Sequence, residues 1–349
     1  MTARVAVVGG GVAGLATAWY LRAADSPPDV TIIESSSQLG GKLRTTAVGG
    51  VRVELGADSF LTVPDHAVRL CHRLGLGDEM VAPAAQQVQV WTRGKLYPLP
   101  EGSMLGVPTR LRPLLTSGLL TRIGAARAAL DLVLPRSLAT EDASVGRWIG
   151  SRLGREIVER LVDPVLGGVY AGDVDRLSVV AATPRLAEAA RLHRSLLLGL
   201  RARDSNGEQE AGPLSRTLRG GLCRLVDRLL VDPRGRGQVE PRGRGLEVRR
   251  PATARRVLPH AGGYRVELVD ADPIEADSVV LAVPAFAAAA LLRDAAPVAA
   301  GVLAKIPYAS VAVVTFIYPP GTHTPAGSGM LVPSGEGRFV KAATWVSSK

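Results

Sequence analysis

Cysteine and aromatic residues are scarce in this 349-residue sequence. Its two cysteines, Cys71 and Cys223, lie far apart and outside any C-x-x-C pattern, so they provide no disulfide framework. The first apolar run leads directly into a glycine-rich turn, with no small-residue cleavage site of the kind that ends a signal peptide. These features predict a protein of a reducing compartment, the cytoplasm. Aromatic residues make up 4% of the chain, which predicts an aliphatic core.

The sequence also lacks a long apolar run. The stretch that comes closest to the roughly 18 residues of a membrane-spanning helix is Val279–Leu292, and Pro284 interrupts it. Hydrophobic residues nevertheless make up 46%, enough for a large core, and 349 residues favour more than one domain. A formal net charge of +10 favours an anionic substrate, a membrane surface or nucleic acid as partner. A general compositional bias toward arginine explains the charge equally well.

Motifs for side-chain catalysis are absent as well. The five histidines show no metal-ligand spacing, and neither G-x-S-x-G nor G-x-x-x-x-G-K-[ST] occurs. We therefore expect no metal site and no catalytic side chain. The chemistry is expected to come from a bound cofactor, with the protein supplying orientation and electrostatics.

The clearest pattern that is present is a βαβ unit at the N-terminus. A short apolar run, a glycine-rich turn, an apolar helix and a second strand follow one another: Val5–Val8, Gly9–Gly14, Leu15–Leu21 and Val30–Ile33. A G-x-G-x-x-G motif alone is weak evidence, since glycine turns occur by chance. Its place between a buried strand and a helix is typical of dinucleotide binding.

The spacing has a physical reason. Gly9 allows the tight turn, Gly11 lets a pyrophosphate approach the backbone, and Gly14 permits close packing of helix on strand. The N-terminus of the helix then faces the phosphates with its free N–H groups and positive dipole end. Glu34 ends the second strand, where its carboxylate is placed to accept hydrogen bonds from a ribose diol and to repel a 2′-phosphate.

Beyond this unit the sequence alternates strand-like and helical stretches. A helix is expected over Pro64–Leu74, and mainly helical structure over Leu105–Arg203. Expected strands, including a hairpin around Arg93–Gly94, are Arg52–Leu55, Val88–Trp91, Lys95–Leu99, Glu247–Val257, Tyr264–Val269, Ser278–Val283, Ser310–Tyr318 and Gly329–Val332.

Two basic stretches have competing interpretations. The leucines and arginines of 110–134 form a basic amphipathic pattern, typical of a membrane-surface helix or of an ordinary helix with a solvated basic face. The repeat Pro-Arg-Gly-Arg-Gly at 233–237 and 241–245 resembles a nucleic-acid-binding segment. It carries no interleaved aromatic residues for base stacking, so we expect a solvated loop and no nucleic-acid partner.

Several segments, taken in order, resemble the protoporphyrinogen/coproporphyrinogen oxidase family of haem biosynthesis. The most specific is LVDPVLGGVYAGDVDRLSV at 161–179. The others cover 7–21, 34–45, 54–60, 96–109, 219–229, 276–284 and 344–349, so the resemblance spans essentially the whole chain. Members of this family also carry a C-terminal segment with a glycine-rich part that closes the FAD site, and this sequence appears without it.

The resemblance implies an α/β fold with a discontinuous Rossmann-like FAD-binding domain, a mixed-sheet substrate domain and an inserted helical domain. The corresponding boundaries are 1–87 and 213–284 for the FAD domain, 88–104 and 285–349 for the substrate domain, and 105–212 for the helical domain, which is membrane-associated in some members. The cofactor implied is FAD. By resemblance, the residues that bind it are Gly9, Gly10, Gly11, Val12, Ala13, Gly14, Glu34, Ser35, Lys42, Gly56, Ala57, Asp58, Ser59, Ala254 and Trp345.

The activity implied is removal of six electrons from a porphyrinogen in three flavin cycles, with O2 reoxidising the flavin to give H2O2. The segments are most similar to the bacterial branch that oxidises coproporphyrinogen III. Protoporphyrinogen IX oxidase, another flavin amine oxidase or desaturase, and a non-catalytic flavin-binding relic are the alternatives. The partners implied are the porphyrinogen and O2, with peripheral membrane contact and homo-oligomerisation left open. Leu61–Pro64 lacks the basic residues that some members carry there, so no propionate anchor is assigned.

Overall fold

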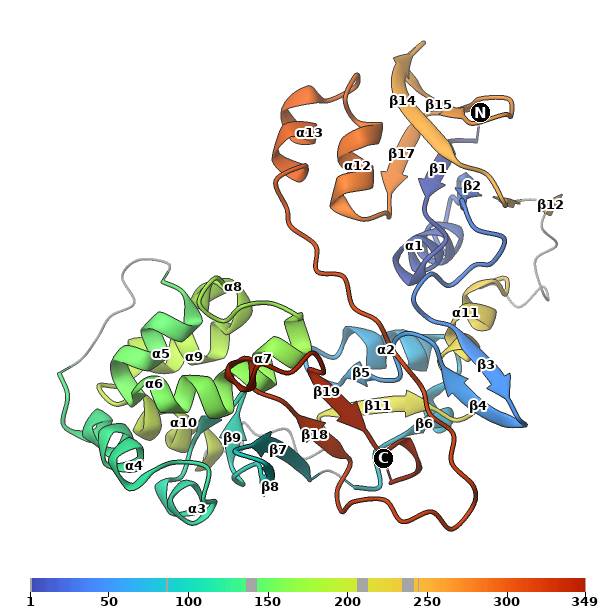
Figure 1. Ribbon diagram of the computed structural model, residues 1–349. Helices are drawn as coiled ribbons and strands as arrows, with labels where there is room; N and C mark the ends of the chain where they lie inside the picture. The colour runs from blue at the N-terminus through green and yellow to red at the C-terminus, as the bar shows by residue number, and fades with distance from the viewer. Residues whose placement is uncertain are drawn as a thin grey trace. The chain divides into compact units, whose positions relative to one another are not determined.

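A computed structural model describes residues 2–85, 87–135, 143–205, 213–233, 242–243 and 245–348. The chain forms two compact units (Figure 1). Unit 1 comprises Met1–Ala82 and Leu214–Ile317, and unit 2 comprises Pro83–Pro213 and Tyr318–Lys349. The division into FAD, substrate and helical domains stays a prediction.

Unit 1 is built around a five-stranded sheet of order β12-β13-β2-β1-β17. Its members are β1 (Arg4–Val8), β2 (Asp29–Ile33), β12 (Arg242–Gly243), β13 (Leu246–Arg249) and β17 (Ser278–Leu281). Strand β1 runs parallel to β2 and to β17, and β13 runs parallel to β2. The predicted strands at both ends of the βαβ unit are therefore confirmed. Strand β17 returns the chain to the same sheet, beside β1.

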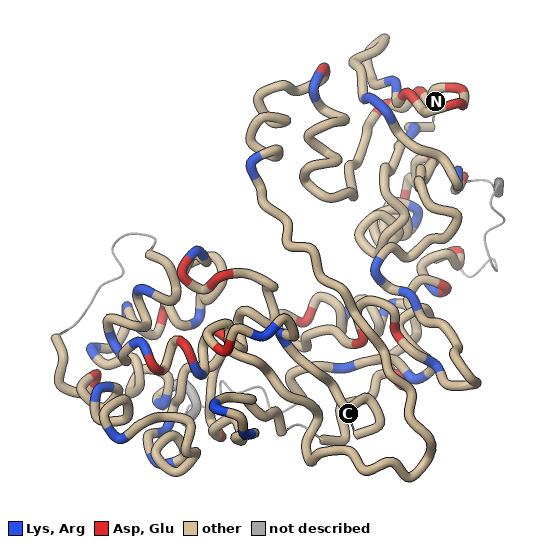
Figure 2. The backbone as a smooth tube through the Cα atoms, in the orientation of Figure 1, with Lys and Arg blue, Asp and Glu red and all other residues tan. Residues whose placement is uncertain are grey.

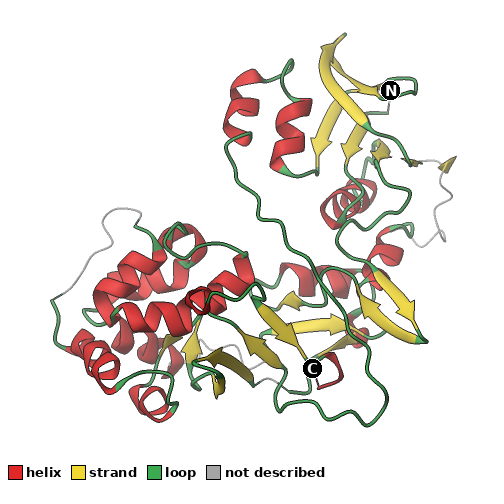
Figure 3. Cartoon of the chain, in the orientation of Figure 1, coloured by secondary structure: helices red, strands yellow, loops and turns green. Residues whose placement is uncertain are grey.

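The inner residues of β1 and β2 are mostly apolar because both faces of the sheet are covered. Successive side chains point to opposite faces. On one face, Val7, Val30 and Ile32 pack with helices α1 (Val12–Arg22) and α11 (Cys223–Leu229). On the other face, Ala6, Val8 and Ile33 pack with an antiparallel sheet. That sheet consists of β14 (Ala254–His260), β15 (Gly263–Leu268) and β16 (Ile274–Ala276), whose strands are drawn in yellow in Figure 3.

Smaller elements complete unit 1. Strands β3 (Thr45–Val48) and β4 (Val51–Glu54) form an antiparallel hairpin. Strand β11 (Ser215–Leu218) pairs with β5 (Phe60–Leu61) and β6 (Met80–Val81). The remaining helices are α2 (His66–Arg73), the 3-10 turn η1 (Gly77–Glu79), α12 (Ala285–Leu291) and α13 (Pro297–Leu303).

Unit 2 combines a mixed sheet with a helical core. The sheet has the order β19-β18-β7-β8, with β7 (Val88–Thr92), β8 (Lys95–Pro98), β18 (Gly329–Leu331) and β19 (Ala342–Thr344). A short hairpin, β9 (Ser103–Met104) and β10 (Val107–Pro108), precedes the helices. Short 3-10 turns are η2 (Leu130–Leu132), η4 (Ser334–Glu336) and η5 (Val346–Ser348). The helices are α3 (Leu111–Thr116), α4 (Arg122–Ala129), α5 (Val145–Leu153), α6 (Arg155–Ile157), a π-helical turn (Val158–Val162), α7 (Asp163–Tyr170), α8 (Val179–Ala182), α9 (Pro184–Leu192) and α10 (Leu196–Ser205).

Two strand predictions were wrong. The stretch 247–257 forms two strands rather than one, because β13 pairs with β2 while β14 pairs with β15. Pro251 between them has no N–H to continue a ladder, a signal already present in the sequence. Residues 310–318 form no strand in the described part of the chain, although their composition favours one. They are exposed in the structure, whereas a stable strand needs neighbouring strands and a covered face.

The repeat at 233–245 lies largely outside the described residues. The described part of the chain holds no helix long and apolar enough to cross a membrane.

Candidate flavin site

The glycine turn between β1 and α1 leaves no room for side chains at two of its positions. Gly9 has φ +109°, and a Cβ there would lie 2.4 Å from the carbonyl oxygen of Ala282, the residue that follows β17. A Cβ at Gly14 would lie 1.9 Å from the carbonyl oxygen of Gly9. Both distances are far below van der Waals contact, so the sheet and the helix can approach this closely only with glycine. The roles predicted for Gly9 and Gly14 in turn and packing are confirmed.

Gly11 differs from these two. Its backbone is extended (φ −76°, ψ 179°), and a Cβ built on it would meet nothing within 4 Å. No side chain caps this end of α1, whose first-turn N–H groups have no intrahelical acceptor. Open space in front of an uncapped helix N-terminus fits an anionic group such as a pyrophosphate. Val12 and Ala13 form the first turn that faces this space.

Glu34 is held against the glycine turn. Its Oε2 accepts a hydrogen bond from the Gly10 N–H (2.7 Å), and its Oε1 accepts one from the Ser36 N–H (2.8 Å). The Ser35 hydroxyl donates a longer bond of 3.4 Å to Oε1. Burial would raise the pKa of Glu34, but the hydrogen bonds from the Ser36 and Gly10 N–H groups outweigh it and lower the pKa below its usual value. Glu34 is therefore a fixed carboxylate at the end of β2, with lone pairs left for further donors.

A second glycine turn packs against the first. The Gly40 N–H donates to the Gly10 carbonyl oxygen (2.8 Å), and a Cβ on Gly41 would lie 3.2 Å from the Gly11 Cα. The chain then passes Lys42, whose carbonyl oxygen accepts the Ala57 N–H at 3.2 Å. Unit 1 thus joins the segments around 9–14, 34–42 and 56–59, which are far apart in sequence.

The remaining predicted residues have different surroundings. The Ser59 hydroxyl donates to the Asp58 carboxylate (2.8 Å) next to the Gly56–Ala57 turn. Ala254 begins β14, and the segment before it is anchored by a hydrogen bond of 2.8 Å from the Ala252 N–H to the Glu34 carbonyl oxygen. Trp345 belongs to unit 2, where its backbone N–H donates to Ser328 (2.9 Å). Its role toward a flavin stays a prediction.

Sequence reasoning missed one group beside these segments. Thr45 and Glu54 face each other across the β3–β4 hairpin, and both bond to the start of α11. Nothing in the local sequence marks this cluster, since Leu222 lies 168 residues after Glu54 and Cys223 lies 178 residues after Thr45.

Comparison with known proteins identifies the fold and the cofactor class. The model of the family "Flavin containing amine oxidoreductase" matches residues 12–345. A coproporphyrinogen III oxidase of Bacillus subtilis is 32% identical over 99% of this chain and 73% of its own length. One from Propionibacterium freudenreichii is 38% identical over 90% of this chain and 63% of its own length. An Exiguobacterium crystal structure, provisionally named a protoporphyrinogen oxidase, is 28% identical and superimposes with a TM-score of 0.83 over 100% of this chain and 74% of its own.

The geometry of the glycine turn and these similarities indicate the same cofactor, a flavin. The space at Gly11, the uncapped start of α1 and the fixed carboxylate of Glu34 fit the diphosphate and ribose of FAD, the cofactor of this oxidoreductase class. The chain belongs to the flavin containing amine oxidoreductase family.

Proposed function

We propose that this chain oxidises coproporphyrinogen III to coproporphyrin III, with FAD as cofactor, O2 as electron acceptor and H2O2 as the reduced product. The observation that carries the proposal is the similarity to coproporphyrinogen III oxidases over 90% and 99% of this chain. The chain spans 63% and 73% of the length of those relatives, so their activity is proposed for it.

In this proposal the residues of the chain bind FAD and orient it. The Gly9–Gly14 turn holds the pyrophosphate, and Glu34 accepts hydrogen bonds from the adenosine ribose. Ser35, Lys42 and Gly56–Ser59 line the flavin, and the backbone near Ala254 meets the adenine. Bound FAD supplies the redox chemistry, two electrons in each of three cycles. The protein needs no acid or base of its own for it.

The fixed orientation of Glu34 supports its proposed role. A carboxylate already held by the Gly10 and Ser36 N–H groups needs no rearrangement to meet the ribose hydroxyls. Its lowered pKa keeps it ionised at neutral pH, the form that accepts hydrogen bonds from a diol and repels a 2′-phosphate.

Protoporphyrinogen IX is the alternative substrate, favoured by the provisional name of the Exiguobacterium protein. Anaerobic mixing of the flavin-loaded chain with each porphyrinogen separates the two proposals. We expect coproporphyrinogen III to bleach the flavin absorbance faster, and admission of air to produce fluorescent coproporphyrin. Faster reduction by protoporphyrinogen IX would replace the first proposal with the second. Reduction by neither would leave another amine oxidase or desaturase activity, and failure to take up FAD would indicate a non-catalytic relic.

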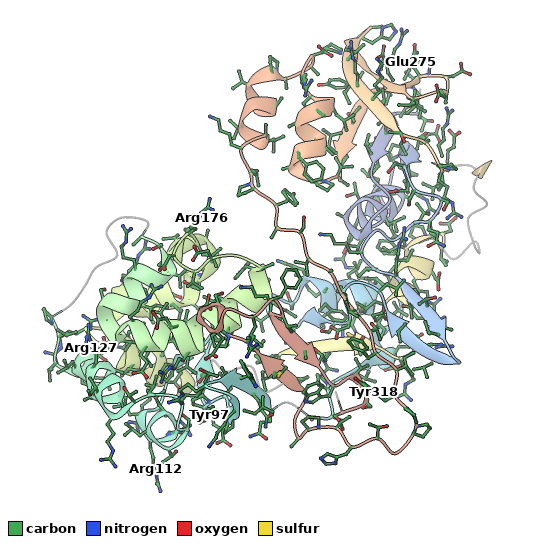
Figure 4. The ribbon with its side chains drawn as sticks, viewed as in Figure 1. Tyr97, Arg112, Arg127, Arg176, Glu275 and Tyr318 are labelled. Atoms are coloured by element: carbon green, nitrogen blue, oxygen red, sulfur yellow. The ribbon has the colours of Figure 1, made fainter. Side chains whose placement is uncertain are left out.

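Peripheral membrane contact and homo-oligomerisation remain predictions. Support for the first comes from a stretch that carries arginines but no acidic residue between Glu101 and Asp131 (Figure 2). Arg112 on α3 and Arg127 on α4 belong to this stretch (Figure 4). It also includes Ile123, whose side chain is 83% exposed. A solvated basic face remains the competing interpretation.

A further inference from the structure

We infer that Glu54 is a positioning residue of the flavin site, through which the start of α11 is bonded to the β3–β4 hairpin. The inference rests on the proposed function, because it concerns the segments proposed to line the flavin. Two arms leave the open end of this hairpin. One arm is residues 42–45, which lead into β3, and the other is residues 54–59, which follow from β4.

The two arms touch each other closely. Thr45 and Glu54 are directly opposite in the hairpin register. Beyond them, the Leu55 N–H donates to the Arg44 carbonyl oxygen (2.8 Å), and a Cβ on Gly56 would lie only 2.1 Å from the Lys42 carbonyl oxygen. The distance between Lys42 and Gly56 is therefore set by this pairing.

The carboxylate of Glu54 connects this pair to a third segment. Its Oε1 accepts the Leu222 N–H at 2.7 Å, and its two oxygens lie 3.0 and 2.9 Å from the Thr45 hydroxyl, which donates to them. The Thr45 oxygen in turn accepts the Cys223 N–H at 3.2 Å. Gly221 has φ +99°, and a Cβ there would lie 2.6 Å from the Thr45 side chain, so the turn before α11 sits tightly on the hairpin.

Helix α11 carries this connection to the glycine turns. Its Leu225 and Val226 belong to the same core cluster as Leu15 of α1. A Cβ on Gly40 would lie 3.0 Å from a methyl group of Val226, and the Gly40 N–H donates to Gly10. Glu54 thus joins the arms around Lys42 and Gly56 to the helix that supports the proposed phosphate-binding turn. Its role is indirect, since it acts through Thr45 and Leu222.

Replacement of Glu54 and Thr45 in the 349-residue chain tests this role. E54A should raise the dissociation constant for FAD at least tenfold and change the visible circular dichroism of the flavin at saturation. T45V, which keeps the side-chain volume but removes the hydroxyl, should weaken FAD binding and change the flavin spectrum to a smaller degree. T45S, which keeps the hydroxyl, should bind FAD as the wild type does. The matched control is E79A. It removes a carboxylate that also bonds α11, through Arg224 (2.9 and 3.1 Å), but touches neither arm.

The control separates positioning from general destabilisation. If E54A and E79A lower the melting temperature similarly and only E54A changes FAD affinity and the flavin spectrum, the positioning role is supported. If E54A binds FAD as wild type does, or if both variants weaken FAD equally, the role is refuted while the proposed function stands.

A flavin-independent measurement separates this inference from the proposed function. In the protein without flavin, amide hydrogen exchange of the two arms, residues 42–45 and 54–59, should rise in E54A and stay unchanged in E79A. Failure of the wild-type chain to bind FAD would overturn the proposed function. Equal exchange in E54A and wild type would overturn the inference.

Discussion

Gly11 offers a substitution that separates cofactor binding from folding. Its φ and ψ are accessible to any residue, and a Cβ there meets nothing within 4 Å. Replacing glycine restricts the unfolded chain, which stabilises the folded protein by about 0.4–1 kcal/mol. Losing glycine at a helix N-cap destabilises the folded protein by a comparable amount. We therefore expect Gly11→Val to leave the free energy of unfolding without flavin within about 1 kcal/mol of wild type.

The same substitution should abolish flavin retention. The branched side chain would occupy the space in front of α1, where the pyrophosphate is proposed to approach the backbone. A loss of at least a hundredfold in FAD affinity corresponds to about 2.7 kcal/mol. Titration of the flavin-free protein with FAD, followed by flavin fluorescence, measures the affinity. Thermal unfolding without FAD measures the stability.

Gly14→Ala is the contrasting variant. Its Cβ would begin 1.9 Å from the Gly9 carbonyl oxygen, so β1 and α1 must separate. Overpacking of this kind typically costs about 1–3 kcal/mol, and we expect the flavin-free protein itself to lose stability. FAD bound by Gly11→Val with wild-type affinity would refute the assignment of this space to the pyrophosphate. Equal stability loss in both variants would refute the distinction drawn between the two glycines.

Three further predictions concern carboxylates. Glu34→Ala should raise the dissociation constant for FAD about tenfold or more, since a hydrogen bond to a charged group contributes about 1.5–3 kcal/mol; unchanged affinity in a titration would remove the ribose role. Because the pKa of Glu34 is lowered in the folded protein, its carboxylate stabilises the fold fully above its unfolded pKa of about 4.3, and this contribution is lost as the pH falls through the folded pKa. In Glu34→Gln the free energy of unfolding should therefore fall less steeply as the pH is lowered through this range. Asp131 is fully buried and accepts hydrogen bonds from Arg152 and Ser195, both at 2.7 Å. Asp131→Asn leaves the Arg152 charge buried without its partner and should cost about 3–5 kcal/mol in chemical unfolding, whereas Glu159→Gln, in an exposed pair, should change little. A loss below 1 kcal/mol would show that the buried pair is not needed.

Local patterns predicted those elements whose surroundings are encoded nearby. The run Val5–Val8, the turn Gly9–Gly14 and the acidic end of the next strand lie within 31 residues, and all three formed as expected. Residues 310–318 have the composition of a strand but none in the structure, because strand formation depends on a partner that composition does not reveal.

The sequence by itself determined the βαβ unit, its three glycines and the acidic residue at the end of β2, because these requirements are local and set by backbone sterics. Only the tertiary structure decided that Glu34 is held by Gly10 and Ser36, and that Glu54 bonds Thr45 and the start of α11. The Glu34–Gly10 bond spans 24 residues and the Glu54–Leu222 bond spans 168. Their geometry follows from how the sheet, hairpin and helices pack, which no short stretch of sequence specifies.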